Sequence, residues 1–332
     1  MNQIKVVQVG IGPLGQKITQ FIAQRKGIAV IGAVDVAPEL IGTDLGELCG
    51  LDKMGIKIQG SIAACLKGKK PDVVLLTTVS SLEKITPQIE EIVANGLPVV
   101  STCEELSFPW ETSKSLSERI DKAAKINQVA VLGTGVNPGF LMDAFPIYLT
   151  AVCQKVDKVK VSRIQDAAFR RIPFQKKIGA GLTIKEFKKK QKLGVLRHVG
   201  LTESVQMTAN CLGWQLDRTE DVLTPVIAKE EIVTEHLRIP AGDASGVQQI
   251  GKGYVDGEEK ITLVFRASIN EPYPADTIEI QGDPNIKSTI SGGVNGDVAT
   301  CAVTINAVGR IIDAKPGLRT MADMPLISYF EA

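Results

Sequence analysis

The feature that most constrains the fold of this chain is a glycine-rich turn close to its first residue, in the segment VVQVGIGPLGQKI. The glycines follow a short apolar run and open a stretch with helical periodicity. In that setting they allow a tight turn and the close approach of a pyrophosphate, whose charge meets the helix N-terminus. A glycine-rich turn of another α/β fold is the alternative. The predicted dinucleotide site contains Gly10, Gly12, Pro13, Leu14 and Gly15.

Residues 1–136 alternate short apolar runs with amphipathic stretches. Continuous runs of Val, Ile and Leu are typical of parallel strands covered on both faces, and strands alternating with helices predict a doubly wound parallel sheet. We therefore expect an α/β dinucleotide-binding domain of the Rossmann type over 1–136. The expected strands are 6–9, 29–34, 73–76, 99–100 and 129–132, with helices at 15–24 and 81–95.

The pattern changes after residue 136. Longer stretches with period-2 character, separated by turns such as VDGEEK, predict a second α+β domain with a mixed sheet over 137–295. We expect this domain to bind substrate and to mediate oligomerisation. A final helix at 296–313 opens a tail, 296–332, that is predicted to pack back on the first domain. The expected strands of the second domain are 157–164, 232–239, 248–254, 261–267 and 277–281, with helices at 184–192 and 204–212.

Composition excludes several classes of function. At 332 residues the chain is too long for one compact core, which agrees with two domains. A net charge of +1 gives no electrostatic case for nucleic acid or an anionic membrane as partner. Six cysteines without a Cys-x-x-Cys spacing, and only two histidines, argue against disulfides and a metal site and for a reducing, cytoplasmic setting.

Two further strand ends complete the predicted dinucleotide site. Asp35 ends the second apolar run, where a carboxylate accepts hydrogen bonds from ribose hydroxyls and repels a 2′-phosphate, so NAD is favoured over NADP. A turn aspartate is the alternative, and dual cofactor use stays open. Thr77, Thr78, Val79 and Ser80 follow the apolar run at 73–76, where small side chains let the nucleotide approach the backbone. For Ser80 a helix N-cap is an equal alternative.

The apolar run at 99–100 continues as VVSTCEEL, which places two adjacent carboxylates at the same edge of the sheet. Ligands of open α/β sheets bind beyond the carboxyl ends of the strands, so a carboxylate there can accept a proton from an ammonium group. We predict Glu104 as the acid/base residue and Glu105 as the second candidate. The alternative is that both are first-turn carboxylates that favour the helix dipole. Cys103 is predicted to touch the cofactor, with nothing nearby that marks it as a nucleophile.

Two loops supply the candidate substrate residues. In GTGVNPGF, Asn137 is predicted to fix the nicotinamide, while the three residues after it line a pocket expected between the domains. A domain-linking turn is the alternative. In RRIPFQKKIGAGLT, a cation and backbone N–H groups of the glycine loop are predicted to hold a substrate carboxylate, with a solvated basic face as the alternative. The predicted substrate residues are Pro138, Gly139, Phe140, Arg170, Lys177 and Gly179.

Six segments together resemble one family. GIGPLGQKI, VDVAPELIGTDLGELCG, STCEELSFPW, VLGTGVNPGFLMD, RRIPFQKKIGAG and KPGLRTMADMP are similar to the 2,4-diaminopentanoate dehydrogenases and the related native amine dehydrogenases, which are relatives of dihydrodipicolinate reductase. The resemblance implies NAD(P)-dependent oxidative deamination of a primary amine, or reductive amination in reverse. It further implies 2,4-diaminopentanoate as substrate, 2-amino-4-oxopentanoate and ammonia as products, and Glu104 at the position of the acid/base glutamate.

Two departures separate the chain from other relatives. Dihydrodipicolinate reductases carry a His-His-x-x-Lys-x-Asp pattern and then Ser-Gly-Thr where this chain has FQKKIGAGLT, and homoserine-type dehydrogenases place Lys where Glu104 stands. The alternatives are an amine dehydrogenase for simpler amines and ketones, an imine reductase of the dihydrodipicolinate reductase type, and a non-catalytic dinucleotide-binding sensor. A homodimer is expected, because second-domain sheets of this kind commonly pair across a two-fold axis.

Overall fold

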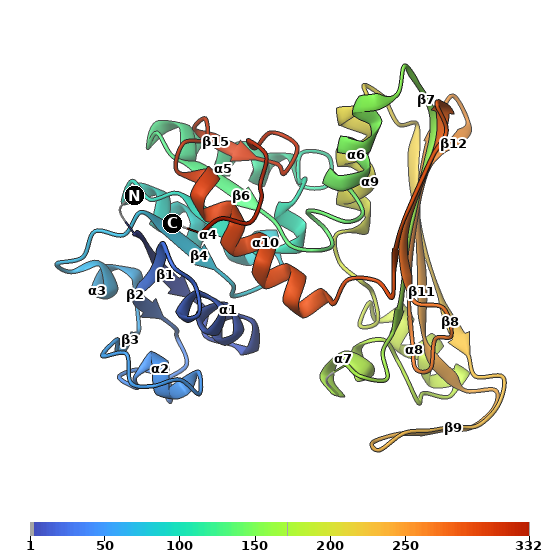
Figure 1. Ribbon diagram of the computed structural model, residues 1–332, viewed down its shortest axis with the longest axis horizontal. Coiled ribbons are helices and arrows are strands. Elements are labelled where there is room, and N and C mark those ends of the chain that lie inside the picture. The colour runs from blue at the N-terminus through green and yellow to red at the C-terminus, as the bar shows by residue number, and fades with distance from the viewer. Residues whose placement is uncertain (1–2, 171, 332) are drawn as a thin grey trace. The chain divides into compact units, whose positions relative to one another are not determined.

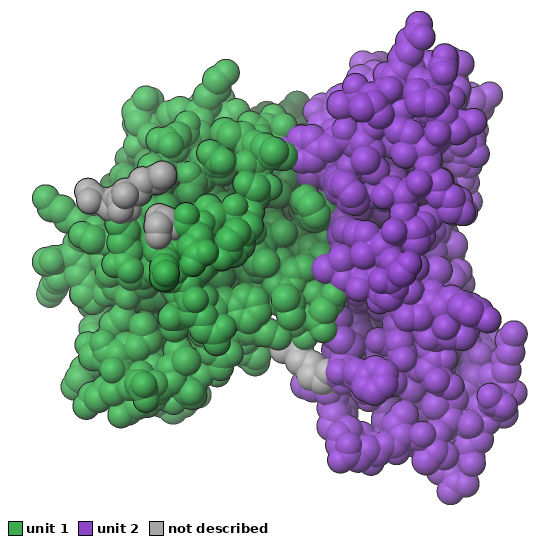
Figure 2. Space-filling model, viewed as in Figure 1, with its two compact units in different colours: residues 1–140, 295–332 green, residues 141–294 purple. Residues whose placement is uncertain are grey.

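The computed structural model describes residues 3–170 and 172–331, and these form two compact units (Figure 2). Unit 1 contains residues 1–140 and 295–332, and unit 2 contains residues 141–294. The chain therefore passes from unit 1 into unit 2 and returns for its last segment. Among the described residues, no helix is long and apolar enough to cross a membrane.

Unit 1 is built on a seven-stranded sheet in which every pair of neighbouring strands is parallel (Figure 1). The strand order is β15-β6-β5-β4-β1-β2-β3, so the winding direction reverses between β1 and β4. This confirms the predicted doubly wound parallel sheet. The strands are β1 (Ile4–Val9), β2 (Ile28–Val34), β3 (Ile58–Gln59), β4 (Val73–Leu76), β5 (Val99–Ser101), β6 (Ala130–Gly133) and β15 (Gly317–Arg319).

Helices cover this sheet through apolar faces. The four residues of β4 have no exposed surface, as expected of a parallel strand buried on both sides. In α4 the residues Ile85, Ile89 and Ile92 repeat at helical spacing and are also fully buried. Helix α10 packs against α1 and β5. The helices of unit 1 are α1 (Pro13–Ala23), α2 (Leu45–Leu48), α3 (Ile62–Leu66), α4 (Leu82–Ala94), α5 (Lys114–Ile126) and α10 (Gly296–Ile311).

Unit 2 contains the predicted mixed sheet, with six strands in the order β14-β13-β7-β12-β11-β8. Only the β7–β12 pair is parallel. The helices of this unit lie on one face of the sheet (Figure 1). The strands are β7 (Lys155–Asp166), β8 (Arg218–Ile227), β11 (Ala244–Val255), β12 (Glu258–Ser268), β13 (Ala275–Asp283) and β14 (Ile286–Ser291). The helices are α6 (Ala144–Leu149), α7 (Ile172–Lys177), α8 (Ile184–Lys192) and α9 (Leu201–Cys211), with a 3₁₀ turn η2 (Thr150–Val152).

One predicted strand of unit 2 is wrong. Residues 232–239 form two short antiparallel strands, β9 (Ile232–Val233) and β10 (Arg238–Ile239), outside the main sheet. The hydroxyl of Thr234 accepts hydrogen bonds from the backbone N–H groups of His236 and Leu237 and so closes the turn between them. Strand β8 was not predicted, because its sequence RTEDVLTPVI is half polar and contains a proline. That residue, Pro225, is tolerated because β8 is an edge strand.

Candidate active site

A pocket of about 530 Å³ opens at the carboxyl ends of β1, β2 and β4 in unit 1. This is the edge of a doubly wound sheet at which ligands bind, next to the point where the strand order reverses. The pocket brings together six of the predicted cofactor residues. These are Gly10, Gly12, Asp35, Thr77, Thr78 and Val79.

The glycines of the turn are needed for different physical reasons. Gly10 has a φ of +87°, and a Cβ there would lie 2.8 Å from the carbonyl oxygen of Thr77. A Cβ on Gly15 would collide with the carbonyl oxygen of Gly10. A Cβ on Gly12 would instead meet no heavy atom within 4 Å. Gly10 and Gly15 therefore allow the turn to pack on itself, whereas Gly12 faces the open space that a pyrophosphate needs.

The N-terminus of α1 fits an anion. Its N-cap is Gly12, which has no side chain to satisfy the first N–H groups, and its first turn carries no acidic residue. Pro13 occupies the first helical position, where a missing N–H costs nothing. Leu14 follows it within the first turn and is half-buried. Unsatisfied N–H groups and the positive end of the helix dipole together suit a phosphate.

Asp35 is held rigidly at the rim of the pocket. Its Oδ2 accepts a hydrogen bond from the backbone N–H of Ile11 at 2.7 Å, and its Oδ1 accepts one from the N–H of Ala37 at 2.9 Å. A carboxylate oxygen has more than one lone-pair site, so both oxygens keep capacity for ribose hydroxyls. The carboxylate is thus a fixed negative charge on the pocket wall.

The loop after β4 is ordered by hydroxyl groups. The Thr77 hydroxyl donates to the carbonyl oxygen of Gly10 at 2.9 Å and accepts from the side-chain amide of Gln8 at 2.8 Å. The Thr78 hydroxyl donates to Gln88 on α4 at 2.9 Å. Ser80 is exposed and does not line the pocket. These bonds join the glycine turn, the loop and α4 into one wall.

Both candidate acid/base residues lie in a 3₁₀ turn, η1 (Glu104–Leu106), directly after β5. Oε2 of Glu105 accepts a hydrogen bond from the backbone N–H of Leu82, the first residue of α4, at 2.7 Å. The Glu104 carboxylate is half-buried, and among the described residues no hydrogen bond or ion pair engages it. Of the two carboxylates, Glu104 is the one whose oxygens remain available to a ligand.

Cys103 lies beneath this turn. It is 1% exposed and does not line the pocket. Burial, together with the charges of Glu104 and Glu105, raises the pKa of the Cys103 thiol to about 12. The thiol is therefore neutral at physiological pH, which agrees with the expectation that it is no nucleophile.

The turn after β6 contains an unusual buried amide. Asn137 is 8% exposed and precedes Pro138 through a cis peptide bond, and its side-chain nitrogen and oxygen have no hydrogen-bond partner among the described residues. The neighbouring Val136 N–H donates to the hydroxyl of Thr300 on α10. Gly139 is buried with a φ of +123°, and Phe140 is half-buried. A buried donor and a buried acceptor that lack partners can pair with the oxygen and the NH₂ group of a carboxamide.

The substrate residues predicted in unit 2 have local roles. The Arg170 guanidinium stacks over the Phe174 ring at 4.3 Å. Lys177 is exposed, and Gly179, with a φ of +75°, packs against Phe187. The N-terminus of α8, which follows the glycine loop, is already satisfied by a capping box.

In that box the hydroxyl of Thr183 accepts from the backbone N–H of Glu186, whose carboxylate accepts in turn from the Thr183 N–H. An anion is therefore not needed at this helix end.

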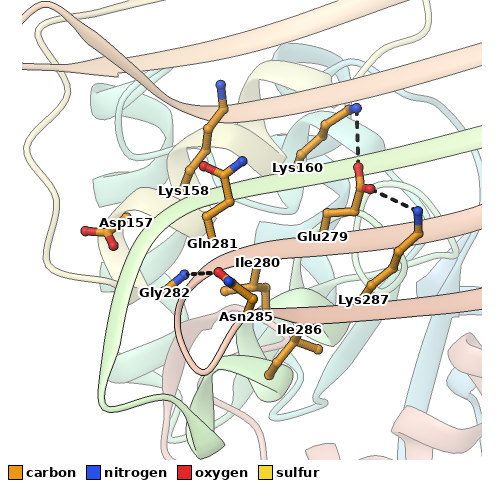
Figure 3. Close-up of a pocket in the computed structure, with 10 residues that line it drawn as sticks. All are labelled: Asp157, Lys158, Lys160, Glu279, Ile280, Gln281, Gly282, Asn285, Ile286 and Lys287. Carbon is orange, nitrogen blue, oxygen red and sulfur yellow. Dashed lines mark hydrogen bonds and ion pairs between the residues drawn. The ribbon is translucent and has the colours of Figure 1, made fainter.

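Unit 2 has a second, open pocket of about 820 Å³ on β7, β13 and β14 (Figure 3). Its charged groups are largely paired with one another. The Glu279 carboxylate bridges the ammonium groups of Lys160 and Lys287 at 3.3 and 3.2 Å. No predicted site residue lines this pocket, and paired surface lysines do not make a catalytic centre.

Several pocket residues carry no signal in the sequence. They lie at the carboxyl ends of β1 and β2, in the β3–α3 turn, at the first residue of α3 and on one face of α4, and only the folded chain brings them to the pocket. Gln88 and Glu91 are three residues apart on α4, a spacing that any surface helix shows. The lining residues that were not among the predicted site residues are Val9, Val34, Val36, Gly60, Ser61, Ile62, Gln88 and Glu91.

A doubly wound sheet with a glycine-lined pocket at its carboxyl edge defines a dinucleotide-binding protein. Comparison with known proteins agrees with this class. Residues 4–106 match the profile of the dihydrodipicolinate reductase N-terminus, and residues 140–331 match the 2,4-diaminopentanoate dehydrogenase C-terminal domain. The chain belongs to the family of 2,4-diaminopentanoate and amine dehydrogenases, and is an NAD(P)-dependent dehydrogenase that acts on CH–NH₂ groups.

Two curated relatives and one solved structure match nearly the whole chain. The 2,4-diaminopentanoate dehydrogenase of Acetoanaerobium sticklandii is 32% identical over 98% of this chain and 94% of its own length. An amine dehydrogenase of Streptomyces virginiae is 22% identical over 97% of this chain and 96% of its own length. The solved structure of an amine dehydrogenase from Mycobacterium smegmatis shares the fold, with a TM-score of 0.84, 22% identity and coverage of 98% and 97% of the two chains.

Proposed function

We propose that this protein oxidatively deaminates 2,4-diaminopentanoate to 2-amino-4-oxopentanoate and ammonia. The observation that carries the proposal is the 32% identity to a 2,4-diaminopentanoate dehydrogenase over 98% of the chain. The match of residues 140–331 to the 2,4-diaminopentanoate dehydrogenase C-terminal domain supports it, because this profile is specific to that enzyme family and not to dinucleotide binding in general.

In this proposal Glu104 acts as the acid/base residue. Its carboxylate accepts a proton from the substrate ammonium, which frees the nitrogen lone pair that drives loss of hydride from the neighbouring carbon. A bound nicotinamide supplies the hydride acceptor. Water then adds to the substrate iminium, and Glu104 relays protons as ammonia leaves. Overall, the ammonium form of the substrate, the oxidised cofactor and water are converted to the ketone, an ammonium ion, the reduced cofactor and one proton.

We further propose NAD as the preferred cofactor. The Asp35 carboxylate is fixed by two backbone N–H groups, so it cannot swing away from a 2′-phosphate. Glu91 adds a second carboxylate to the lining of the pocket, and no lysine or arginine is among the lining residues. A phosphate would therefore meet like charge without a compensating cation.

The remaining site residues are assigned by chemistry. Asn137 is proposed to hold the nicotinamide carboxamide, because its buried amide lacks partners within the described parts of the chain. Pro138, Gly139 and Phe140 are proposed to shape the substrate pocket. Arg170 is proposed to pair with the substrate carboxylate, and Lys177 to contribute a second positive charge further out. The loop that contains Gly179 is proposed to support α7 and α8.

The test is reduction of NAD and of NADP, followed by absorbance, with 2,4-diaminopentanoate and with simple primary amines. We expect rapid reduction with release of ammonia, faster with NAD. Glu104→Gln is expected to lower kcat about 10²–10⁴-fold while leaving NADH affinity unchanged. Turnover of simple amines without turnover of 2,4-diaminopentanoate would contradict the substrate assignment, and a fully active Glu104→Gln variant would contradict the mechanism.

A further inference from the structure

The α4 helix is capped by a residue from another element. Its own N-cap residue, Ser81, makes no capping hydrogen bond with its side chain. Oε2 of Glu105 instead accepts the hydrogen bond of the Leu82 N–H at 2.7 Å. A carboxylate at a helix N-terminus also meets the positive end of the helix dipole. Glu105 thus replaces a local cap with one that comes from a turn 23 residues further along the chain.

The same carboxylate restrains the turn that carries Glu104. The backbone around Glu104 is held on one side by the Ser107 hydroxyl, which donates to the Glu104 carbonyl oxygen at 2.8 Å. On the other side the Cys103 N–H donates to the Ser101 hydroxyl at 3.1 Å. The Glu105–Leu82 bond links this turn to α4. Since adjacent residues of a 3₁₀ turn point about 120° apart, a fixed Glu105 restricts the directions that the Glu104 side chain can take.

Helix α4 and the loop before it form part of the dinucleotide pocket. Thr77, Thr78 and Val79 precede the helix, and Gln88 and Glu91 lie on it. Displacement of α4 would move Gln88 and with it Thr78, whose hydroxyl donates a hydrogen bond to the Gln88 side chain. One hydrogen bond therefore joins the acid/base turn to the wall of the cofactor pocket.

We propose that Glu105 is a positioning residue that couples the placement of Glu104 to the dinucleotide pocket, and that it does not itself transfer a proton. The inference rests on the proposed role of Glu104. It assigns the two adjacent glutamates to different tasks, one to chemistry and one to geometry.

The experiment compares Glu105→Ala, Glu105→Gln and Glu105→Asp with Ser81→Ala as the matched control. NADH affinity is measured by fluorescence titration, kcat by amine turnover, and folding by circular dichroism. Glu105→Ala is expected to weaken NADH binding about fivefold and to lower kcat by at least that factor, because a helix cap and the turn geometry are both lost. Glu105→Asp, whose carboxylate is one methylene shorter, should behave like the alanine variant.

Glu105→Gln keeps an acceptor oxygen at the same distance from the backbone. Its NADH affinity and its kcat should therefore both stay within about threefold of the parent protein. Ser81→Ala should change neither, since the Ser81 side chain caps nothing.

The inference is overturned if Glu105→Gln is as slow as Glu104→Gln with normal NADH affinity, because Glu105 would then carry protons. It is equally overturned if Glu105→Ala lowers only the melting temperature. Should Glu105→Ala fail to fold, Glu105→Asp against Glu105→Gln decides the question. If no amine is turned over by any form, the proposed function fails, while the NADH affinities still test the coupling.

Discussion

Individual glycines of the turn determine the shape of the cofactor pocket. Gly10 is constrained by its own backbone, which has a positive φ and lies close to Thr77. Nothing in the described parts of the chain constrains Gly12, because a Cβ there meets open space and its φ of −67° suits any residue. Replacing Gly10 should therefore affect folding, whereas replacing Gly12 should affect cofactor binding.

At this scale we predict opposite outcomes for Gly10→Ala and Gly12→Ala. Gly10→Ala should reduce the free energy of unfolding by about 1–3 kcal/mol, because alanine is strained at that φ. Gly12→Ala should leave the free energy of unfolding within about 0.5 kcal/mol of the parent and weaken NADH binding at least about tenfold by blocking the pyrophosphate. Urea unfolding and NADH titration measure the two effects. Normal NADH binding by Gly12→Ala would contradict the placement of the pyrophosphate.

Cross-strand ion pairs join the strands of unit 2 on the face that bears no helices. Glu259 on β12 receives the ammonium groups of Lys158 on β7 and Lys252 on β11 at 3.1 and 2.7 Å. The hydroxyl of Thr262 donates to the same carboxylate. Burial by itself raises the pKa of Glu259, but the three donors outweigh it and hold that pKa at about 2.

This cluster makes a pH-dependent contribution to stability. The folded-state pKa of Glu259 is depressed, so its contribution is present above the ordinary value of 4.5 and is lost as the pH falls towards 2. Glu259→Gln should reduce the free energy of unfolding by about 1–2 kcal/mol at pH 7, after allowance for solvent screening. Denaturant unfolding at pH 7, 5 and 3 should show the variant and the parent converging as the pH falls.

The matched control is Glu258→Gln, which removes a neighbouring carboxylate that is 73% exposed and forms an ion pair with Lys260. Its effect should be small at every pH. A Glu259→Gln deficit that stays constant from pH 7 to pH 3 would show that packing, and not charge, accounts for the loss.

For the molecule as a whole, the sheet of unit 2 has one covered and one uncovered face. The side chains of Val159, Val161, Ile261 and Leu263 face α6 and α9 and are buried. The opposite face carries no helix within the described residues (Figure 1). A row of cross-strand neighbours, here called the middle row, runs over β8, β11, β12 and β7 on this face. It consists of Val222, Ile250, Val264 and Ser162.

We propose that this face pairs with a second copy across a two-fold axis, as expected for a homodimer. Charged rows beside the middle row contain both signs, including Lys160 with Glu279, which makes the face self-complementary. Val264→Asp should dissociate the dimer, because it buries an unpaired charge in the interface. Val233→Asp, which alters an apolar residue that is 68% exposed on the β9–β10 hairpin, is the control. Light scattering after size exclusion gives the mass, and a monomeric parent protein would refute the proposal.

Much of unit 1 could be predicted from the sequence, because its signals are local. The expected strand at 73–76 coincides with β4, and the other expected strands agree with β1, β2, β5 and β6 to within a few residues. The glycine turn, Asp35 and Thr77 all reach one pocket, since parallel strands bring their carboxyl ends to one edge. In unit 2 the periodicity indicated a mixed sheet, but it did not reveal the break at Thr234 or the edge strand β8.

Patterns in the sequence were enough to predict five strands of unit 1, the glycines that the dinucleotide turn requires and a carboxylate pair directly after β5. These properties depend on residues a few positions apart. The folded chain was needed to show that Glu105 caps α4, that the buried Asn137 side chain has no hydrogen-bond partner among the described residues, and that Gln88 and Glu91 line the pocket. The physical reason is that hydrogen-bond partners and buried volumes are set by segments distant in the chain, so two adjacent glutamates with the same chemistry receive different surroundings.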